Sequence, residues 1–287
     1  MRSAEDKKGA SFLLREVREL EGFRLCEDLQ KEVWGFEDRS VVPLPMMVLA
    51  QRFGGVVVGA YSKAGELIGF VYGFPALKGE KLIHYSHMLA VKKNYRSQGI
   101  GRLLKLEQRR MALEKGIDLT VWAFDPLERA NARLNISSLG AIIREYEVDF
   151  YGPGTSILHQ GLPTDRLLAE WHLTTPRVEE HINKKKGSRH LAEKPTVKAV
   201  DLVRHRQGLP RPVASRLDLT AAGLLVAIPD DIQSLKARDL ALAREWLFAV
   251  REALTTSFKA GYAITGFLDP QTEEGASYYY LEREFNM

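Results

Sequence analysis

Two spacings of apolar residues divide the first half of the chain into expected strands and helices. Short runs rich in β-branched and aromatic residues predict strands at 11–17, 56–62, 66–77, 81–91 and 119–124. Apolar residues three or four positions apart predict helices at 19–35, between 42 and 55, and at 101–116. Asp125 as cap, with Pro126 next and Glu128 three positions on, predicts a helix that runs to about Ser138. These elements indicate an α/β (α+β) fold.

Beyond about residue 152 the pattern weakens. Residues 165–215 mix charges with prolines and are expected to be irregular or partly extended. Regular spacing returns with a strand at 223–229, a long helix that stops before Gly261, and strands at 262–268 and 277–284. We therefore expect three segments, which are a domain at 1–152, an irregular connection at 153–215, and a smaller β-α-β unit at 216–287.

Composition predicts the class of protein and the cellular compartment. Of 287 residues, 45% are hydrophobic and 27% charged, as in ordinary globular proteins. The single cysteine, Cys26, excludes an internal disulfide and a site of several thiolates, so we expect no metal centre of that kind and a reducing compartment. No apolar run approaches the roughly 20 residues that span a bilayer, and the first ten residues lack the apolar core of a signal peptide. These features predict a cytoplasmic protein with no membrane partner.

The charge of the chain gives little indication of a polyanionic partner. Net charge is +4, and the only dense basic run is at 184–189. A nucleic-acid binder usually gathers its basic residues on one face or one helix, so we expect no nucleic-acid partner. A mild positive field still favours an anionic small molecule.

The segment between the strand at 81–91 and the helix at 101–116 carries the candidate chemistry. Residues 96–101 read RSQGIG. This run is not a P-loop, and Leu104 stands where a dinucleotide fingerprint needs its third glycine. The first turn of a helix has N–H groups without partners and favours anions, and glycines at 99 and 101 let a phosphate approach that backbone. A strand–helix turn without a ligand is the alternative.

These residues resemble motif A of the GNAT superfamily of acyl-CoA-dependent N-acyltransferases. The glycine run follows Leu89-Ala90-Val91, as in that motif, and a second motif is met by 131–133 and 139–141, which read NAR and LGA. The order of elements agrees as well, and the resemblance covers about 11–152. It implies the GNAT fold, with a mixed central sheet whose strands at 81–91 and 119–124 splay apart around the pantetheine arm.

The resemblance also implies an acyl-CoA site. Strand backbone at Leu89 and Val91 would hold the pantetheine, an amide near Leu89 would polarise the thioester, and Asn131 would contact the cofactor arm. The amides of 97–102 would bind the pyrophosphate, with arginine charge at the rim. The expected cofactor-binding residues are Leu89, Ala90, Val91, Arg96, Ser97, Gln98, Gly99, Ile100, Gly101, Arg102 and Asn131, and the expected cosubstrate is acetyl-CoA or another acyl-CoA, without a metal.

A candidate base lies on the strand at 81–91. Attack on a thioester needs a neutral amine, so a group that accepts a proton is useful. Strand alternation places Tyr85, His87, Leu89 and Val91 on one face, and in the family this face looks toward the acceptor. His87 is the candidate base or relay, with Tyr85 as a second candidate, and a histidine that only fills the strand is the alternative. The tyrosine that many GNAT proteins use as an acid is replaced by Ile136, which leaves the proton donor unassigned.

The acceptor is only weakly indicated. The motifs, together with 161–167 and 170–173, resemble a bacterial subfamily of predicted acyltransferases linked to N-succinylation of amino acids. That resemblance favours a small-molecule amine, with succinyl-CoA as one donor and Arg133, Arg144 or Arg166 as a partner for an anionic substrate. A protein N-acetyltransferase and a non-catalytic acyl-CoA-binding module are the alternatives. The unit at 216–287 is expected to be a lid, a homodimer contact or a GNAT-like half.

Overall fold

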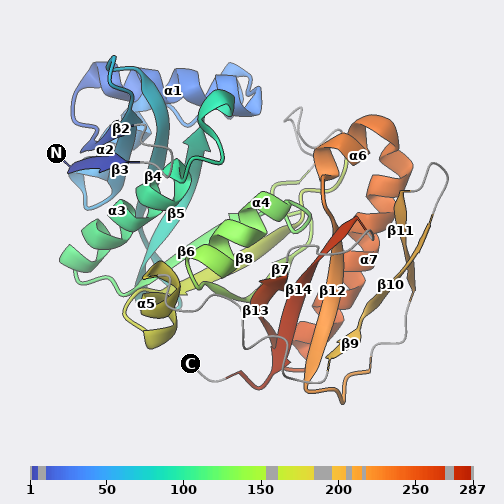
Figure 1. The fold of residues 1–287 in the computed structure, drawn as a ribbon. Helices are drawn as coiled ribbons and strands as arrows, with labels where there is room; N and C mark the ends of the chain where they lie inside the picture. The colour runs from blue at the N-terminus through green and yellow to red at the C-terminus, as the bar shows by residue number, and fades with distance from the viewer. Residues whose placement is uncertain are drawn as a thin grey trace. The chain divides into compact units, whose positions relative to one another are not determined.

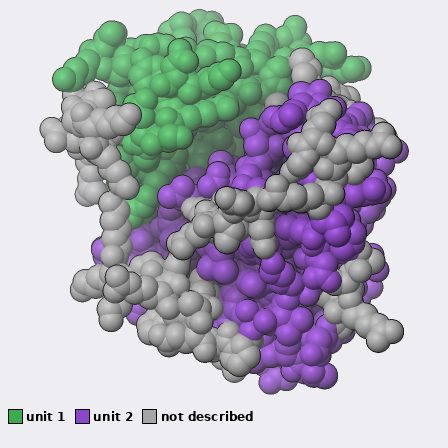
Figure 2. Space-filling model, turned by 45° about the vertical axis from the view of Figure 1, so that its right-hand side comes forward, with its two compact units in different colours: residues 1–122, 155–159 green, residues 123–154, 160–287 purple. Residues whose placement is uncertain are grey.

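The computed structural model describes residues 2–5, 11–152, 161–183, 196–204, 209–214, 218–268 and 275–285. The chain divides into two compact units, coloured separately in Figure 2. The first is built on Met1–Trp122 with Thr155–His159, and the second on Ala123–Gly154 with Gln160–Met287. This division does not coincide with the border expected near residue 152.

The first unit is a sheet in which neighbouring strands follow chain order. Its strands pair antiparallel from β1 to β5, whereas β5 and β6 are parallel. Antiparallel neighbours need only short turns, which is why the predicted hairpin at residues 63–65 suffices between the third and fourth strands. The bounds are β1 Arg2–Glu5, β2 Ser11–Glu16, β3 Val56–Tyr61, β4 Leu67–Lys78, β5 Lys81–Val91 and β6 Leu119–Phe124.

Helices cover both faces of this sheet (Figure 1). α1 (Leu20–Trp34) and α2 (Leu44–Arg52) pack on one face, around a core that includes Phe23, Met47 and Phe70. α3 (Ile100–Glu114) packs on the other face through Ile100 and Leu104. Two short 3₁₀ turns, η1 (Asp38–Ser40) and η2 (Lys93–Tyr95), lie in the connections. The predicted helices at 19–35 and 101–116 are confirmed, each within a residue or two of the expected end.

The second unit is a sheet in the order β8-β7-β13-β14-β12-β9, with a separate β10–β11 hairpin. The antiparallel pair β7–β8 meets the antiparallel pair β13–β14 where Ile143 is opposite Ile264. Each of these two antiparallel pairs follows a helical segment, η3 before β7 and α7 before β13. The bounds are α4 Arg129–Ala132, the π-helical η3 Arg133–Ser138, β7 Ile142–Glu147, β8 Arg166–His172, α5 Pro176–Ile182, β9 Thr196–Lys198, β10 Val200–Arg204, β11 Pro210–Ala214, β12 Gly223–Pro229, α6 Ile232–Arg238, α7 Leu240–Lys259, β13 Tyr262–Leu268 and β14 Ala276–Arg283.

Two expectations for this part of the chain are wrong in detail. The helix expected from Pro126 begins only at Arg129, because the Asp125 carboxylate accepts the Leu127 amide at 2.8 Å in a local turn instead of capping a helix there. The stretch expected to be irregular or partly extended contains the strand β8 and also a helix, α5, which was not expected. The buried Leu167, Trp171 and Val178 of these two elements supply an apolar face among the charged residues around them. The expected helix and strands after residue 223 are confirmed.

Within the described residues, no helix is long and apolar enough to cross a membrane. Cys26 is buried in the first unit, and burial raises the pKa of its thiol to about 12. A thiol in that state is protonated and inert at neutral pH.

Candidate functional site

The start of α3 is shaped to receive an anion. Gly99 is the N-cap residue with φ 86°, and a Cβ built there meets nothing within 4 Å. The amides of the first turn have no carbonyl partners inside a helix, and a glycine cap offers no side chain to satisfy them. Ser97 also has a positive φ, 62°, in the region that glycine prefers. The loop is thus held in a conformation that turns bare backbone outward.

Side chains of the loop hold this conformation. Arg96 Nε donates to the Val91 carbonyl at 3.1 Å, and Gln98 Nε2 donates to the Asn94 carbonyl at 3.1 Å. Both bonds tie the loop to the chain just before it. Arg102, in the first turn of α3, is half-buried, and burial lowers the pKa of its guanidinium. Positive charge therefore lies on both sides of the glycines.

Two helices of the second unit, α6 and α7, begin differently. The Asp231 carboxylate accepts the Ser234 amide at 2.9 Å before α6, and the Asp239 carboxylate accepts the Leu242 amide at 2.9 Å before α7. These carboxylates satisfy the first turns and repel anions. The start of α3, with glycine as its N-cap residue, lacks the carboxylate that occupies the starts of α6 and α7.

Beside this loop, β5 and β6 part. Within the described residues the two strands pair only where His84 is opposite Thr120 and Tyr85 is opposite Val121. From Ser86 to Val91 the edge of β5 has no partner on β6, so its backbone groups can bond to a ligand that enters as an extra strand.

A β-bulge reshapes β5 at the same place. Tyr72 is opposite Met88, whereas Gly73 is opposite Ser86, so His87 is the additional residue. One additional residue reverses the alternation of the faces. The expectation that Tyr85, His87, Leu89 and Val91 share one face is therefore wrong, because Leu89 and Val91 pack with the α3 side while Met88 and Ala90 join the core beneath α1 and α2.

His87 lies among aromatic rings. Its ring centroid is 5.9 Å from that of Tyr72, 6.1 Å from Phe74 and 6.2 Å from Tyr85. Tyr72 belongs to the core under α1 and α2, which places His87 toward that side of the sheet. Burial lowers the pKa of His87 below its usual value of 6.5. At neutral pH the imidazole is therefore uncharged and able to accept a proton.

Comparison with known proteins identifies this architecture. The family model for the acetyltransferase (GNAT) family matches residues 20–134, which span α1 to the start of η3 and include β5, the glycine loop and α3. These residues form a GNAT acetyltransferase domain. The predicted superfamily and the predicted class of enzyme, an N-acyltransferase, are confirmed, and the bacterial subfamily stays a prediction. No curated protein matches the chain significantly.

Solved structures that resemble part of this chain include an Acinetobacter baylyi protein described as an acetyltransferase, at 22% identity and TM-score 0.47 over 57% of this chain and 93% of that one. The ribosomal-protein-S18-alanine N-acetyltransferase of Escherichia coli has 15% identity and TM-score 0.46, over 57% of this chain and 95% of its own. Arabidopsis thaliana Naa50, solved with a bisubstrate analogue, has 16% identity and TM-score 0.44, over 55% of this chain and 98% of its own. Similarity at this level does not bear on the substrate.

The remaining predicted residues of the GNAT site lie in the second unit. Asn131 is exposed on α4, and Ile136, where many GNAT proteins carry a tyrosine, is buried in η3. Arg144 donates to Glu170 Oε2 at 3.1 Å, and Arg166 donates to the Asp165 carbonyl at 2.8 Å. Arg144 and Arg166 thus have structural contacts, and Arg133 is exposed and also has an interaction partner.

Sequence reasoning missed a buried polar group under the point where β5 and β6 part. Lys105 of α3 is only 2% exposed, and its Nζ donates to Ser86 Oγ at 2.7 Å. The signal was present, because Lys105 lies among the inward positions Leu104, Gln108 and Met111 of the helix. A lysine at such a position is rarely buried without a function or a partner.

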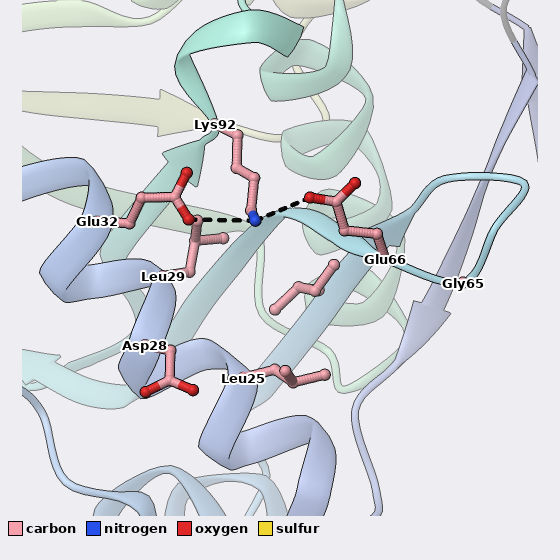
Figure 3. A pocket seen from close by; sticks show the side chains of 8 residues that line it. Leu25, Asp28, Leu29, Glu32, Gly65, Glu66 and Lys92 are labelled. Atoms are coloured by element: carbon pink, nitrogen blue, oxygen red, sulfur yellow. Dashed lines mark hydrogen bonds and ion pairs between the residues drawn. The ribbon is translucent and has the colours of Figure 1, made fainter.

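A second polar cluster of the GNAT domain surrounds a pocket of about 200 Å³ lined by α1 and the start of β4 (Figure 3). Lys92 Nζ lies 3.1 Å from Glu32 Oε2 and 2.9 Å from Glu66 Oε1. Bonding to Lys92 lowers the pKa of Glu66, and bonding to Glu66 raises the pKa of Lys92. This cluster is a surface network of two ion pairs that share Lys92, and it is not poised for proton transfer at neutral pH. Among the described residues, no three His, Cys, Asp or Glu side chains are grouped as a metal site would need.

Proposed function

We propose that the GNAT domain transfers an acyl group from coenzyme A to the amine of a small molecule. The observation that carries the proposal is the union of an uncapped helix start at Gly99 with an unpaired edge of β5 that begins at Ser86. The first feature suits a pyrophosphate and the second suits an extended amide-bearing arm. Coenzyme A contains both groups in sequence.

The residues present fit this ligand. The amides of residues 97–102 would hold the pyrophosphate, and the backbone of Leu89, Ala90 and Val91 would pair with the pantetheine. Arg96 and Arg102 would add charge at the rim, and Asn131 would contact the arm. The bound thioester supplies the activated acyl carbon. A backbone amide near Leu89 would bind the carbonyl oxygen as charge builds on it.

His87 is proposed as the base of the reaction. It lies at the bulge, on the side of α1 and α2, whereas Leu89 and Val91 face the α3 side. This separation lets the amine approach from one face and the donor from the other. Its lowered pKa keeps the imidazole neutral, so it can take the proton that the amine loses. Tyr85, whose ring neighbours His87, is proposed to orient the acceptor or extend the relay.

For the acceptor we propose an amino acid, with acetyl-CoA or succinyl-CoA as donor. The aromatic rings around His87 suit a compact acceptor with an apolar part. A peptide acceptor is the second candidate, because acylation of a terminus needs the same amine chemistry. A domain that binds acyl-CoA without turnover is the third.

The test separates binding from chemistry. Calorimetry with CoA, acetyl-CoA and succinyl-CoA should show one site per chain, since the proposed site needs both the glycine-capped start of α3 and the adjacent edge of β5 that has no partner on β6. Release of free thiol, followed over a panel of amino acids, polyamines and short peptides, should then rise with one class of amine. Binding without turnover on any amine would contradict the enzyme and leave the binding module. Turnover on peptides alone would contradict the small-molecule acceptor.

A further inference from the structure

Lys105 is held in the GNAT domain by an unusual set of neighbours. Its Nζ donates to Ser86 Oγ at 2.7 Å and to Gln108 Oε1 at 3.3 Å, and it lies 3.6 Å from the centroid of the Trp122 ring. Among the residues that the structure describes, no Asp or Glu carboxylate forms a salt bridge with Lys105. An ammonium in this setting has a cation–π contact and neutral acceptors only, so burial lowers its pKa well below the usual range.

The location of this group is as informative as its chemistry. The last pair between β5 and β6 joins Tyr85 to Val121, so Ser86 and Trp122 are the first residues beyond the fork. Lys105 contacts both of them from α3. It therefore sits at the apex of the gap that the pantetheine arm is proposed to enter.

We propose that Ser86 and Lys105 form the proton donor for the departing thiolate, in place of the tyrosine that Ile136 replaces. This inference rests on the proposed acyltransferase function. Ser86 is the group that touches the sulfur, and Lys105 acts through Ser86. Ser86 precedes His87 in the strand, but its side chain faces α3 while His87 faces α1 and α2, so acid and base lie on opposite sides of the sheet.

The step balances without an added reactant. The amine nitrogen forms a bond to the acyl carbon as the bond from that carbon to sulfur breaks, and the electron pair stays on sulfur. The amine gives one proton to His87. Ser86 gives its hydroxyl proton to sulfur and takes one from the Lys105 ammonium. Lys105 is left neutral, His87 is left charged, and exchange with solvent restores both.

The groups around Lys105 permit this transfer. From β5 it faces His84, whose pKa burial lowers to about 3, so His84 is neutral. From β6 it faces Trp122, and along α3 it faces Gln108; neither side chain titrates. Lys115, at the exposed end of α3, is the other cation that acts on His84. Because no carboxylate of the described residues pairs with it, the ammonium gives the proton up more readily than a surface lysine does.

The decisive measurement does not depend on turnover. Nitrogen-15 spectra of lysine-labelled protein would follow the Lys105 Nζ titration, which is assigned by its loss in Lys105→Met. Binding of CoA should move that titration, whereas desulfo-CoA, which lacks the thiol, should bind and leave it in place. Equal effects of the two ligands would overturn the proposal. Failure of both to bind in calorimetry would instead reject the acyl-CoA site itself.

Kinetics give the second readout. Lys105→Met and Ser86→Ala should each lower kcat by about tenfold or more, as expected for loss of a general acid, with CoA affinity kept within about twofold. In both variants the rate should no longer fall at high pH, because that fall in the wild type reports deprotonation of the general acid. Lys115→Met makes the same change at the exposed C-cap residue that follows α3, and in this control the rate should still fall at high pH. If the rate still falls at high pH in both Ser86→Ala and Lys105→Met, once each is shown to be folded, Ser86 and Lys105 are not the proton donor.

Discussion

The carboxylate of Asp165 is held by both arms of the Arg251 guanidinium, with Nε at 2.7 Å and the second nitrogen at 2.8 Å from its two oxygens. The Asp165 side chain is fully buried, and it also accepts the Tyr146 hydroxyl at 2.5 Å and the Asp149 amide at 3.1 Å. These bonds tie β8 to α7 and to the end of β7. One buried carboxylate thereby links several elements of the second unit.

Asp165→Asn should destabilise the protein by about 3 kcal/mol, since it leaves the Arg251 charge without its counterion in a partly buried setting. Urea unfolding at neutral pH measures this loss. Glu245→Gln is the matched control, because its bidentate pair with Arg211 is 41% exposed on each side and should contribute about 1 kcal/mol or less. Equal losses in the two variants would show that Asp165 is not the anchor.

Gly99→Ala should weaken CoA binding by about tenfold or more, because a Cβ would project into the space that the pyrophosphate needs. Gly116→Ala is the control at the other end of the same helical region. Gly116 also has a positive φ, 74°, and open space around its Cβ position, so both variants carry the same backbone strain of about 1 kcal/mol. Calorimetry should show lost affinity only for Gly99→Ala, and a loss shared by both would point to strain alone.

His87→Gln should lower the acyl-transfer rate by about a hundredfold and remove the acidic limb of the pH profile. In the wild type the rate should hold as pH falls through 6.5, the usual value, and decline only as the lowered pKa of His87 is reached. His181→Gln is a matched control, since burial also lowers the pKa of that histidine, which lies on α5 of the second unit. If the rate of His87→Gln declines at low pH as it does in the wild type, His87 is not the base.

His84 should make the folded state less stable as pH falls. Burial lowers its pKa from 6.5 to about 3, so between these values the unfolded chain binds a proton that the folded chain does not. Stability is therefore greatest above pH 6.5 and declines by up to about 1.4 kcal/mol for each unit below it. Denaturant unfolding measures the free energy of unfolding of the wild type and of His84→Met at pH 7 and pH 5. Between these two pH values the wild type should lose about 2 kcal/mol more than the variant. Equal declines in the wild type and in His84→Met would show that folding does not lower the pKa of His84.

Local patterns in the sequence predicted much of the first unit. Helix spacing and the glycine that follows it predicted α1, and Gly35 ends that helix with φ 64°. The glycine pair predicted the bare start of α3, because positive φ and close approach to the backbone are properties of single residues. Asp125, in contrast, satisfied the rules for a helix cap, yet it bonds to Leu127 in a turn. The side chain of such an aspartate can stabilise either a turn or a helix start with similar energy, so tertiary packing decides which of the two forms.

The sequence by itself determined that a strand, a bare glycine loop and a helix follow one another at residues 81–116, since spacing and turn chemistry are written in neighbouring residues. Only the tertiary structure decided which faces they present. The bulge at His87 depends on the register with β4, and it reverses every side chain beyond it. The burial of Lys105 beneath Ser86 and Trp122 likewise required three elements to meet, and no local pattern records which distant residues will exclude water from a lysine.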